Sequence, residues 1–285
     1  MTFTIPYKNL DLYHTLISGQ TFEWDFDMSK NIWSGSVYEN AIKIQQIGNN
    51  IEGELKYESK ENLDSEITKY FGLEDDYEDL INKISFDKNI APAIEKLYGL
   101  RVIQQDPWLC INSFILSQNN TVKNIQNSLR NISNLVRQRN ANSTFTFYPK
   151  YEDIVILSKQ DLTFCKTGYR ADYLIDFYSK IENNNNWLTD LNNLNYVDAK
   201  NKLMEVKGIG EKVADCILLY AYGKYEAYPL DTHLRKATKE IFFSYTDKTP
   251  SDKEIRKWAS QYWGSVAGFA HFFLFTYHRI YGRLK

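Results

Sequence analysis

The chain has few cysteines and no long apolar run. Its three cysteines, Cys110, Cys165 and Cys216, are scattered along 285 residues without a CxxC pair. An odd, unclustered set excludes a disulfide scaffold and favours a reducing compartment. The N-terminus lacks the basic and apolar regions of a secretory signal. Apolar runs such as 269–277 are too short to span a bilayer. We therefore expect a cytoplasmic protein without a membrane partner.

An excess of positive charge is also missing. There are 34 basic and 36 acidic residues, giving a net charge of −2, which taken alone argues against a nucleic-acid partner. The charge is uneven, however, because residues 200–285 carry +6 and the preceding residues −8. A basic end can present a local positive field to an anionic partner. Two differently charged solvent faces would give the same counts.

The hydrophobic pattern predicts an α+β protein. Residues 21–26, 33–38 and 41–46 alternate bulky and polar side chains between turn residues, which is typical of antiparallel strands with one wet face. Helices are predicted at 61–70, 77–84, 90–99, 108–116, 122–136, 151–158, 171–182, 198–205, 211–222, 232–243, 251–262 and 265–280. We expect a sheet domain with short helices over 1–97 and a helical domain over 98–285.

The most informative stretch is 203–217, with the sequence LMEVKGIGEKVADCI. Gly208 and Gly210 flank one apolar residue between two predicted helices, so a tight helical hairpin is expected near 203–222. Glycines permit a positive-φ turn and let backbone N–H groups approach an anion, which the next helix N-terminus also attracts. A plain helix–turn–helix connector would contain the same glycines.

Two side chains near this hairpin suggest chemistry. Lys212 lies in the first turn of the second helix, and Cys216 lies one turn later on the same face. Because the positive end of the helix disfavours an ammonium, a lowered pKa is predicted for Lys212, as in amine nucleophiles. Asp231 precedes another helix at the capping position, where N–H groups stabilise a carboxylate. Separately, each residue could equally be a solvated lysine, a core cysteine or a simple cap.

Together, the block VKGIGEKVADC…YPLDTHLRK resembles the helix-hairpin-helix DNA glycosylases, and especially the 8-oxoguanine DNA glycosylase/AP lyases. Further similar blocks follow in the family's order: SGQTFEW from Ser18, QDP from Gln105, SQNN from Ser117, GYRA from Gly168 and WGSVAGFA from Trp263. The resemblance implies an antiparallel sheet domain like that of TATA-binding protein, followed by the helix-hairpin-helix domain. It also implies a monomer, associated with the nucleoid in a prokaryote, that acts on double-stranded DNA containing 8-oxoguanine and requires no cofactor.

The resemblance assigns the reaction to Lys212 and Asp231. Lys212 would attack the sugar C1′ and form a Schiff base that permits β-elimination, while Asp231 would stabilise the cationic sugar. The implied base-binding residues are Gly19, Cys216, His271 and Phe275. The Gly19 carbonyl would accept a hydrogen bond from N7–H, which 8-oxoguanine has and guanine lacks. Cys216 and Phe275 would enclose the flipped base, with His271 at the base edge where eukaryotic members have glutamine.

The same resemblance implies DNA contacts. The residues concerned are Asn119, Asn120, Tyr169, Arg170, Gly208, Gly210 and His233. Asn119 would fill the gap that a flipped base leaves, Tyr169 would wedge beside the opposite base, and Arg170 would read the estranged cytosine. His233 would contact a flanking phosphate. A monovalent cation bridging to phosphate is expected on the backbone carbonyls of Met204, Val206 and Ile209.

The sequence departs from the family at one predicted DNA-reading position, and two other functions remain possible. Asn124 replaces the second arginine with which eukaryotic members read cytosine, so a weaker preference for cytosine opposite the lesion is predicted. A monofunctional alkyl-base glycosylase would use Asp231 and water. A non-catalytic helix-hairpin-helix protein would only bind DNA. No four-cysteine cluster follows the hairpin, which disfavours an iron–sulfur endonuclease III-like enzyme.

Overall fold

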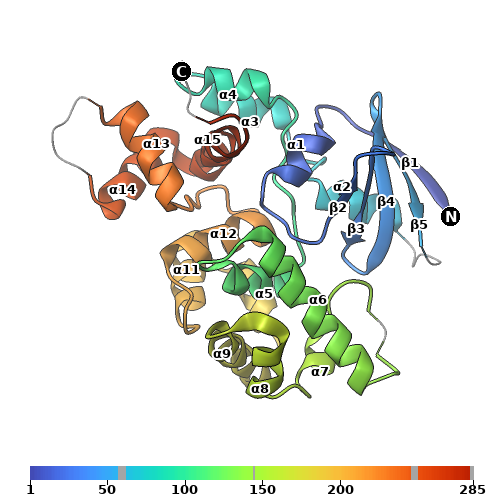
Figure 1. Ribbon diagram of the computed structural model, residues 1–285. Coiled ribbons are helices and arrows are strands. Elements are labelled where there is room, and N and C mark those ends of the chain that lie inside the picture. The colour runs from blue at the N-terminus through green and yellow to red at the C-terminus, as the bar shows by residue number, and fades with distance from the viewer. Residues whose placement is uncertain (57–61, 144, 245–249, 283–285) are drawn as a thin grey trace.

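The computed structural model describes residues 1–56, 62–143, 145–244 and 250–282, and its N-terminal part is a five-stranded antiparallel sheet (Figure 1). The strands run in the spatial order β1-β5-β4-β3-β2. They comprise β1 (Thr2–Pro6), β2 (Asp25–Asp27), β3 (Ile32–Val37), β4 (Asn40–Ile47) and β5 (Asn50–Leu55). The predicted antiparallel sheet is therefore confirmed.

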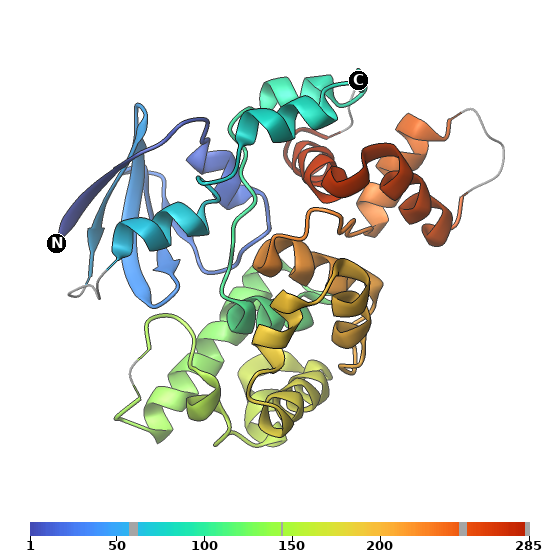
Figure 2. The same cartoon turned by 180° about the vertical axis from the view of Figure 1, so that it is seen from behind.

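One face of the sheet is buried beneath helices. Ile5, Ile42 and Ile44 alternate with more exposed neighbours along their strands and are each 5% exposed or less. They share a core with α1 (Leu12–Ile17) and α2 (Leu63–Tyr70), which lies against the sheet in Figure 2. Period-two alternation has thus placed an apolar face under two amphipathic helices.

The remaining chain is helical. Its α-helices are α3 (Tyr77–Ile84), α4 (Ala91–Lys96), α5 (Pro107–Ser117), α6 (Val122–Arg139), α7 (Tyr151–Ile154), α8 (Lys159–Leu162), α9 (Arg170–Asn183), α10 (Trp187–Asn193), α11 (Tyr196–Met204), α12 (Glu211–Tyr222), α13 (Thr232–Phe242), α14 (Asp252–Trp263) and α15 (Ala267–Tyr281). They surround a second core, to which α3 and α4 also contribute: α4 contacts α15, and α3 contacts the short helical turn Gly264–Val266 that precedes α15. No helix among the described residues has the length and apolar character needed to cross a membrane.

Several local predictions were wrong. Only Asp25–Asp27 of the strand expected at 21–26 is extended and paired, because Phe22 turns into the helical core and Trp24 into the sheet core. The helix expected at 90–99 ends at Lys96, and Gly99 follows it with φ +95°. A Cβ at Gly99 would lie 2.7 Å from the backbone nitrogen of Asp11, so the glycine serves a close crossing of two chain segments.

A buried carboxyl group links the sheet to α2. Glu23 is 5% exposed and accepts a hydrogen bond of 2.5 Å from the Tyr70 hydroxyl, which itself accepts one of 2.8 Å from Trp24 Nε1. Burial raises the pKa of Glu23 to about 7, although the Tyr70 hydrogen bond acts in the opposite direction. The folded protein therefore favours the protonated form of this group.

We predict that Glu23→Gln stabilises the protein at alkaline pH. The folded-state pKa lies above the ordinary value, so stability is fully present below that value and is lost as pH rises through about 7. The gain in the free energy of unfolding should be up to roughly 3 kcal/mol at pH 8 and small near pH 5. Urea unfolding at both pH values checks this. Glu54→Gln, at an exposed site, is the control, and equal gains for Glu23→Gln at pH 5 and 8 would contradict the prediction.

Candidate active site

The helical hairpin is formed by α11 and α12. Gly208 has φ +84°, and a Cβ there would lie 2.3 Å from the Tyr173 ring, so both conformation and packing require glycine. Gly210 instead has extended backbone angles at the N-cap of α12, and nothing lies within 4 Å of a Cβ built on it. The prediction of a positive-φ turn is thus confirmed for Gly208, and the prediction of positive φ is wrong for Gly210. Gly210 leaves open space beside the α12 N-terminus, where an anion is favoured.

Lys212 lies in the first turn of α12. Its ammonium is 5.5 Å from the centroid of the Phe114 ring and shares a hydrogen bond with Cys216. The pKa of Lys212 is raised, mainly by its electrostatic interaction with Cys216 and further by Asp231, whereas burial opposes this. The prediction of a lowered pKa is therefore wrong, because Cys216 and Asp231 favour the ammonium more than burial disfavours it. Burial raises the pKa of Cys216 to about 11, so near neutral pH an ammonium faces a thiol.

Asp231 is the N-cap of α13, as predicted. Its Oδ1 accepts a hydrogen bond of 2.7 Å from the Leu234 backbone nitrogen, which fixes the carboxylate. Its second oxygen has no hydrogen-bond partner within the described part of the chain. The same carboxylate acts electrostatically on Lys212 and on His271. A carboxylate held in place by a backbone hydrogen bond therefore acts electrostatically on the Lys212 ammonium.

His271 and Phe275 occupy successive turns of α15. Their rings are nearly parallel, at 9° with centroids 5.9 Å apart. Burial lowers the pKa of His271 to about 4, and its Nε2 donates a 2.7 Å hydrogen bond to the Pro229 carbonyl. The neutral ring therefore keeps Nδ1 as an acceptor, and this buried atom has no partner among the described residues.

A network of amides that the sequence did not reveal fixes the Gly19 loop. Gly19 follows α1 with φ +90°, and Gln20 is fully buried. The Gln20 side chain bonds to Thr15, Arg101 and Ile103, and Gln105 donates a 2.7 Å hydrogen bond to the Gln20 carbonyl. The SGQ and QDP blocks are thus joined, and the loop is fastened to the segment leading into α5.

Three predicted DNA-contact residues converge on one loop. Arg170 is 8% exposed and donates hydrogen bonds to the carbonyls of Gln118, Asn119 and Thr167. Tyr169 is 51% exposed, and the guanidinium of Arg170 lies 4.5 Å from its ring centroid. Asn119 is exposed with φ +47°. Arg170 thus holds the loop in shape in the absence of DNA, while Asn119 and Tyr169 project into solvent.

The other predicted positions fall in different settings. The Asn120 side chain bonds to the Leu116 carbonyl and to the Thr121 backbone nitrogen. Asn124 is exposed in the first turn of α6, where its backbone nitrogen bonds to the capping Thr121. The Val206 carbonyl accepts a hydrogen bond from the Ile209 nitrogen, which leaves one lone pair for a cation. The side chain of His233 lies outside the described residues.

Asp215 connects the hairpin to the C-terminal helices. Its fully buried carboxylate accepts hydrogen bonds from Tyr196 at 2.7 Å and Lys200 on α11, and from Arg256 on α14 at 3.4 Å. Arg256 also pairs with Glu211 at 2.6 Å. Burial raises the pKa of Asp215, and the two cations and Tyr196 oppose this. Four charged groups thus link the helix of Lys212 to the α13–α14 unit that carries Asp231.

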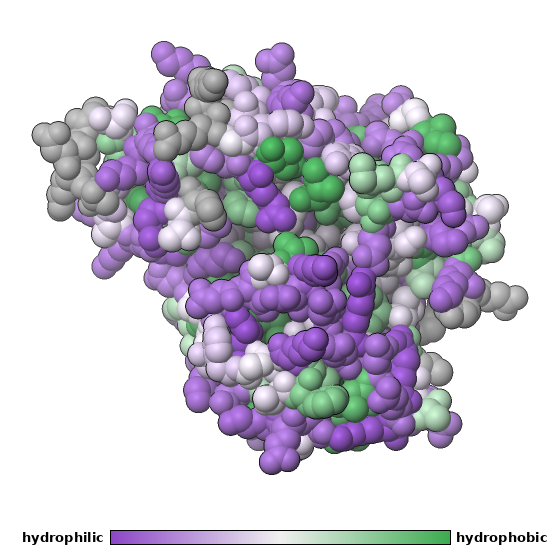
Figure 3. Space-filling view, in the orientation of Figure 1, coloured by the Kyte–Doolittle hydropathy of each residue, from purple (hydrophilic) through white to green (hydrophobic). Residues whose placement is uncertain are grey.

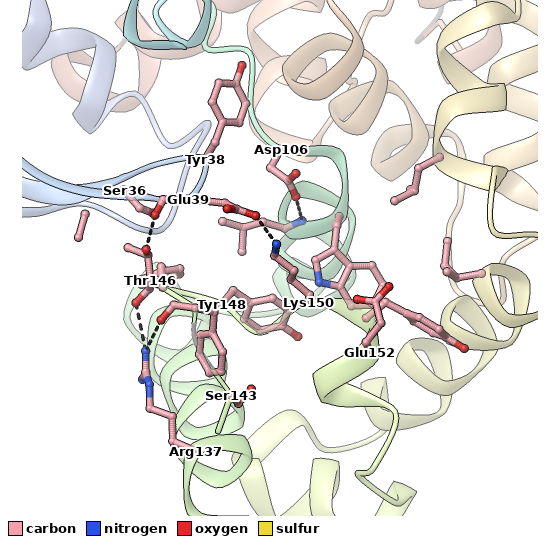
Figure 4. A pocket seen from close by; sticks show the side chains of 18 of the residues that line it. Ser36, Tyr38, Glu39, Asp106, Arg137, Ser143, Thr146, Tyr148, Lys150 and Glu152 are labelled. Carbon is pink, nitrogen blue, oxygen red and sulfur yellow. Dashed lines mark hydrogen bonds and ion pairs between the residues drawn. The ribbon is translucent and has the colours of Figure 1, made fainter. Parts of the chain in front are cut away.

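Electrostatic interactions link Lys212, Cys216, Asp231 and His271 into one cluster. In Figure 3, hydrophobic residues border a hollow between the part formed by α1 and α15 and the part formed by α11 and α12. A cavity of about 1540 Å³ lies elsewhere, between the β3–β4 edge and the segment leading to α7 (Figure 4). None of the predicted site residues lines it. This cavity therefore does not coincide with the predicted site, and the hairpin cluster remains the candidate active site.

Comparison with known proteins assigns each half of the chain. Residues 112–264 match the HhH-GPD superfamily of base excision DNA repair proteins, and residues 2–111 match the N-terminal domain of 8-oxoguanine DNA glycosylases. A probable N-glycosylase/DNA lyase of Methanothermobacter thermautotrophicus is 28% identical over 98% of this chain and 97% of its own length. The chain also resembles an 8-oxoguanine glycosylase/lyase of Clostridium acetobutylicum bound to double-stranded DNA containing cytosine opposite 8-oxoguanine. That similarity has a TM-score of 0.82 and 28% identity over 95% of this chain and 92% of the other.

A further similarity concerns the fold and not the activity. The 3-methyladenine DNA-glycosylase of Archaeoglobus fulgidus has a TM-score of 0.75 over 98% of this chain and 99% of its own, but only 20% identity, which shows the fold alone.

The superfamily model covers more than half of the chain, so this protein belongs to the HhH-GPD base excision DNA repair proteins. Within that superfamily, the N-terminal match makes it a member of the 8-oxoguanine glycosylase group, in the enzyme class of N-glycosylase/DNA lyases. The predicted family, fold class and bifunctional enzyme class are confirmed.

We predict that the Asp215 network is a main source of stability. Asp215→Asn would leave Lys200 and Arg256 without a buried countercharge, so the free energy of unfolding should fall by about 3–5 kcal/mol. Asp25→Asn is the control, because Asp25 pairs with Arg130 at the surface, and it should cost about 1 kcal/mol or less. Urea unfolding of both variants measures the difference. A similar small loss in both would show that the buried network contributes little.

Proposed function

We propose that this protein excises 8-oxoguanine from duplex DNA with Lys212 as nucleophile and then cleaves the abasic strand. The observation that carries the proposal is the cluster at the hairpin, where Lys212 lies against Cys216 and within the field of the capping Asp231. Lys212 Nζ would lose a proton and bond to C1′ as the bond from C1′ to N9 breaks, and the base would leave as a protonated product. Ring opening would give a Schiff base, and loss of a C2′ proton would then break the bond from C3′ to O3′.

Asp231 would serve the step in which the base leaves. Positive charge develops on the sugar as the glycosidic bond breaks, and a preorganised carboxylate stabilises such charge. Its backbone hydrogen bond fixes one oxygen and leaves the other free to face the sugar. The charge that raises the pKa of Lys212 would therefore also lower the barrier to base loss.

The lesion would be held between Cys216 and Phe275. The Gly19 carbonyl would accept N7–H of 8-oxoguanine, and the firm attachment of its loop through Gln20 supports this assignment. His271 would offer the unpartnered Nδ1 to a donor on the base edge. Such fixed acceptors disfavour a base like guanine, which has an acceptor at N7 where 8-oxoguanine has a donor.

Double-stranded DNA would contact the hairpin and the loops beside it. Asn119, Asn120, Tyr169 and Arg170 would surround the vacated position, while Gly208, Gly210 and His233 would contact phosphates. The backbone carbonyls of Met204, Val206 and Ile209 would hold a monovalent cation there. The described residues contain no cluster of three or more His, Cys, Asp or Glu side chains that could bind a metal ion, so this site would use backbone oxygens alone. We further propose that the protein works as a monomer in the cytoplasm.

Covalent trapping tests the nucleophile. With duplex DNA carrying one 8-oxoguanine and borohydride present, the wild-type protein should form an adduct that Lys212→Gln abolishes. Excision should fall by at least about 10³-fold, because the attacking group is lost. Binding to duplex DNA with an abasic analogue should persist. Lys257→Gln removes the same charge at an exposed position and should form as much adduct as the wild type.

Other outcomes of the trapping experiment separate the alternatives. Excision by the wild type without any adduct would favour a monofunctional glycosylase that uses Asp231 and water. Binding without excision would indicate a non-catalytic DNA-binding protein. An adduct that survives in Lys212→Gln would place the nucleophile on another residue.

Opposite-base preference depends on Asn124. We expect excision opposite C to exceed excision opposite A by less than roughly tenfold, since one cytosine-reading arginine is missing. Asn124→Arg should raise this ratio by roughly five- to a hundredfold, and the Thr121 cap should survive because it uses the Asn124 backbone nitrogen. Asn134→Arg adds the same charge near the other end of α6 and is the control. A strict preference for C in the wild type would refute the argument.

A further inference from the structure

An arginine lies directly beside the Gly19 loop. A Cβ built on Gly19 would be 3.0 Å from Cζ and Nη1 of Arg279 and 3.3 Å from its Nε. The flat guanidinium group therefore lies along the backbone of Gly19. The packing of α15 on α1, marked by a hydrogen bond of 2.5 Å between Tyr281 and His14, keeps the two segments together.

The guanidinium has no protein acceptor. Arg279 is exposed, and no hydrogen bond or ion pair joins it to any residue that the structure describes. The Gly19 carbonyl likewise accepts no hydrogen bond within those residues. Guanidinium donors are ordinarily paired with oxygen acceptors when a site is complete. The guanidinium group beside Gly19 and the Gly19 carbonyl thus both remain available to a ligand.

Arg279 also faces the catalytic cluster. It follows Phe275 by one turn and His271 by two on α15, so the three side chains share a face of the helix. Its positive charge acts on the Tyr220 hydroxyl, on which Cys216 and Asp231 act as well. Arg279 therefore lies on the face of α15 that carries the two predicted base-binding side chains.

The lesion has a matching edge. In 8-oxoguanine an N–H donor at N7 is adjacent to a carbonyl acceptor at C8, whereas guanine has an acceptor at N7 and only C–H at C8. A backbone carbonyl with a guanidinium beside it is complementary to the first pair and not to the second. A charge-assisted hydrogen bond to the C8 oxygen would add to the discrimination that the carbonyl supplies.

We propose that Arg279 is a specificity-determining residue that donates a hydrogen bond to the C8 carbonyl oxygen of the flipped 8-oxoguanine while Gly19 accepts N7–H. This inference rests on the proposed function, because it uses the same base-binding site. It assigns the recognition of the oxidised position to a side chain of α15, in addition to the backbone of the Gly19 loop.

Single-turnover excision tests the proposal. Arg279→Met keeps the length of the side chain and removes its donors, so excision of 8-oxoguanine opposite C should fall by roughly tenfold or more. Arg279→Lys keeps one charged donor and should retain more activity. Arg137→Met removes an arginine from α6 and is the control for net charge. Its rate of 8-oxoguanine excision should equal that of the wild type. Affinity for duplex DNA with an abasic analogue should stay within about twofold for all variants, since no base is present.

Each other result overturns the inference in a recognisable way. A parallel loss of abasic-DNA affinity with a reduced salt dependence would make Arg279 a phosphate contact. Faster excision by Arg279→Met would show that the guanidinium blocks the pocket, and unchanged excision would show that it makes no contact. Absence of excision by the wild type would instead refute the proposed function, and the inference with it.

Discussion

The buried carboxylate of Asp215 is the constraint on which the site depends. An anion with no exposed surface is tolerated only because Lys200, Arg256 and the Tyr196 hydroxyl surround it. These partners come from α11 and α14, so one charge fixes the hairpin helices against the C-terminal unit. Lys212 is three residues before Asp215 on α12, and Asp231 begins the helix that packs on α14. The relative position of the two catalytic candidates therefore follows from electrostatic balance in the core.

Periodicity predicted the long helices well and the short elements poorly. Helices α3 and α12 begin and end at the predicted residues, because an apolar stripe, a cap and a terminal glycine or polar residue agree locally. Helix α1, helix α10 and strand β1 were not predicted. Strand β1 is only five residues long and depends on pairing with β5, some fifty residues away, which no local pattern encodes.

Local backbone features of the candidate site were predictable from the sequence, but the protonation state of Lys212 was not. The Asp231 cap and the Gly208 turn follow from local rules and are confirmed. The pKa of Lys212 moves against expectation because Cys216 and Asp231 are close in space, and only Cys216 is close in sequence. Gln20 and Arg279 were not predicted as site residues, since their contacts join segments that are distant along the chain.

A protonated resting lysine changes how the proposed catalysis has to work. Because the pKa of Lys212 is raised above its ordinary value, mainly through Cys216, the ammonium is the favoured form near neutral pH. The site therefore cannot depend on a large population of nucleophile. In the proposed reaction it would depend on placing that amine at C1′, where proximity is worth several kcal/mol, and on a carboxylate that would stabilise the sugar cation. Asp231 lowers the amount of free amine and favours base loss, and the second effect has to be the larger for its position to assist the reaction.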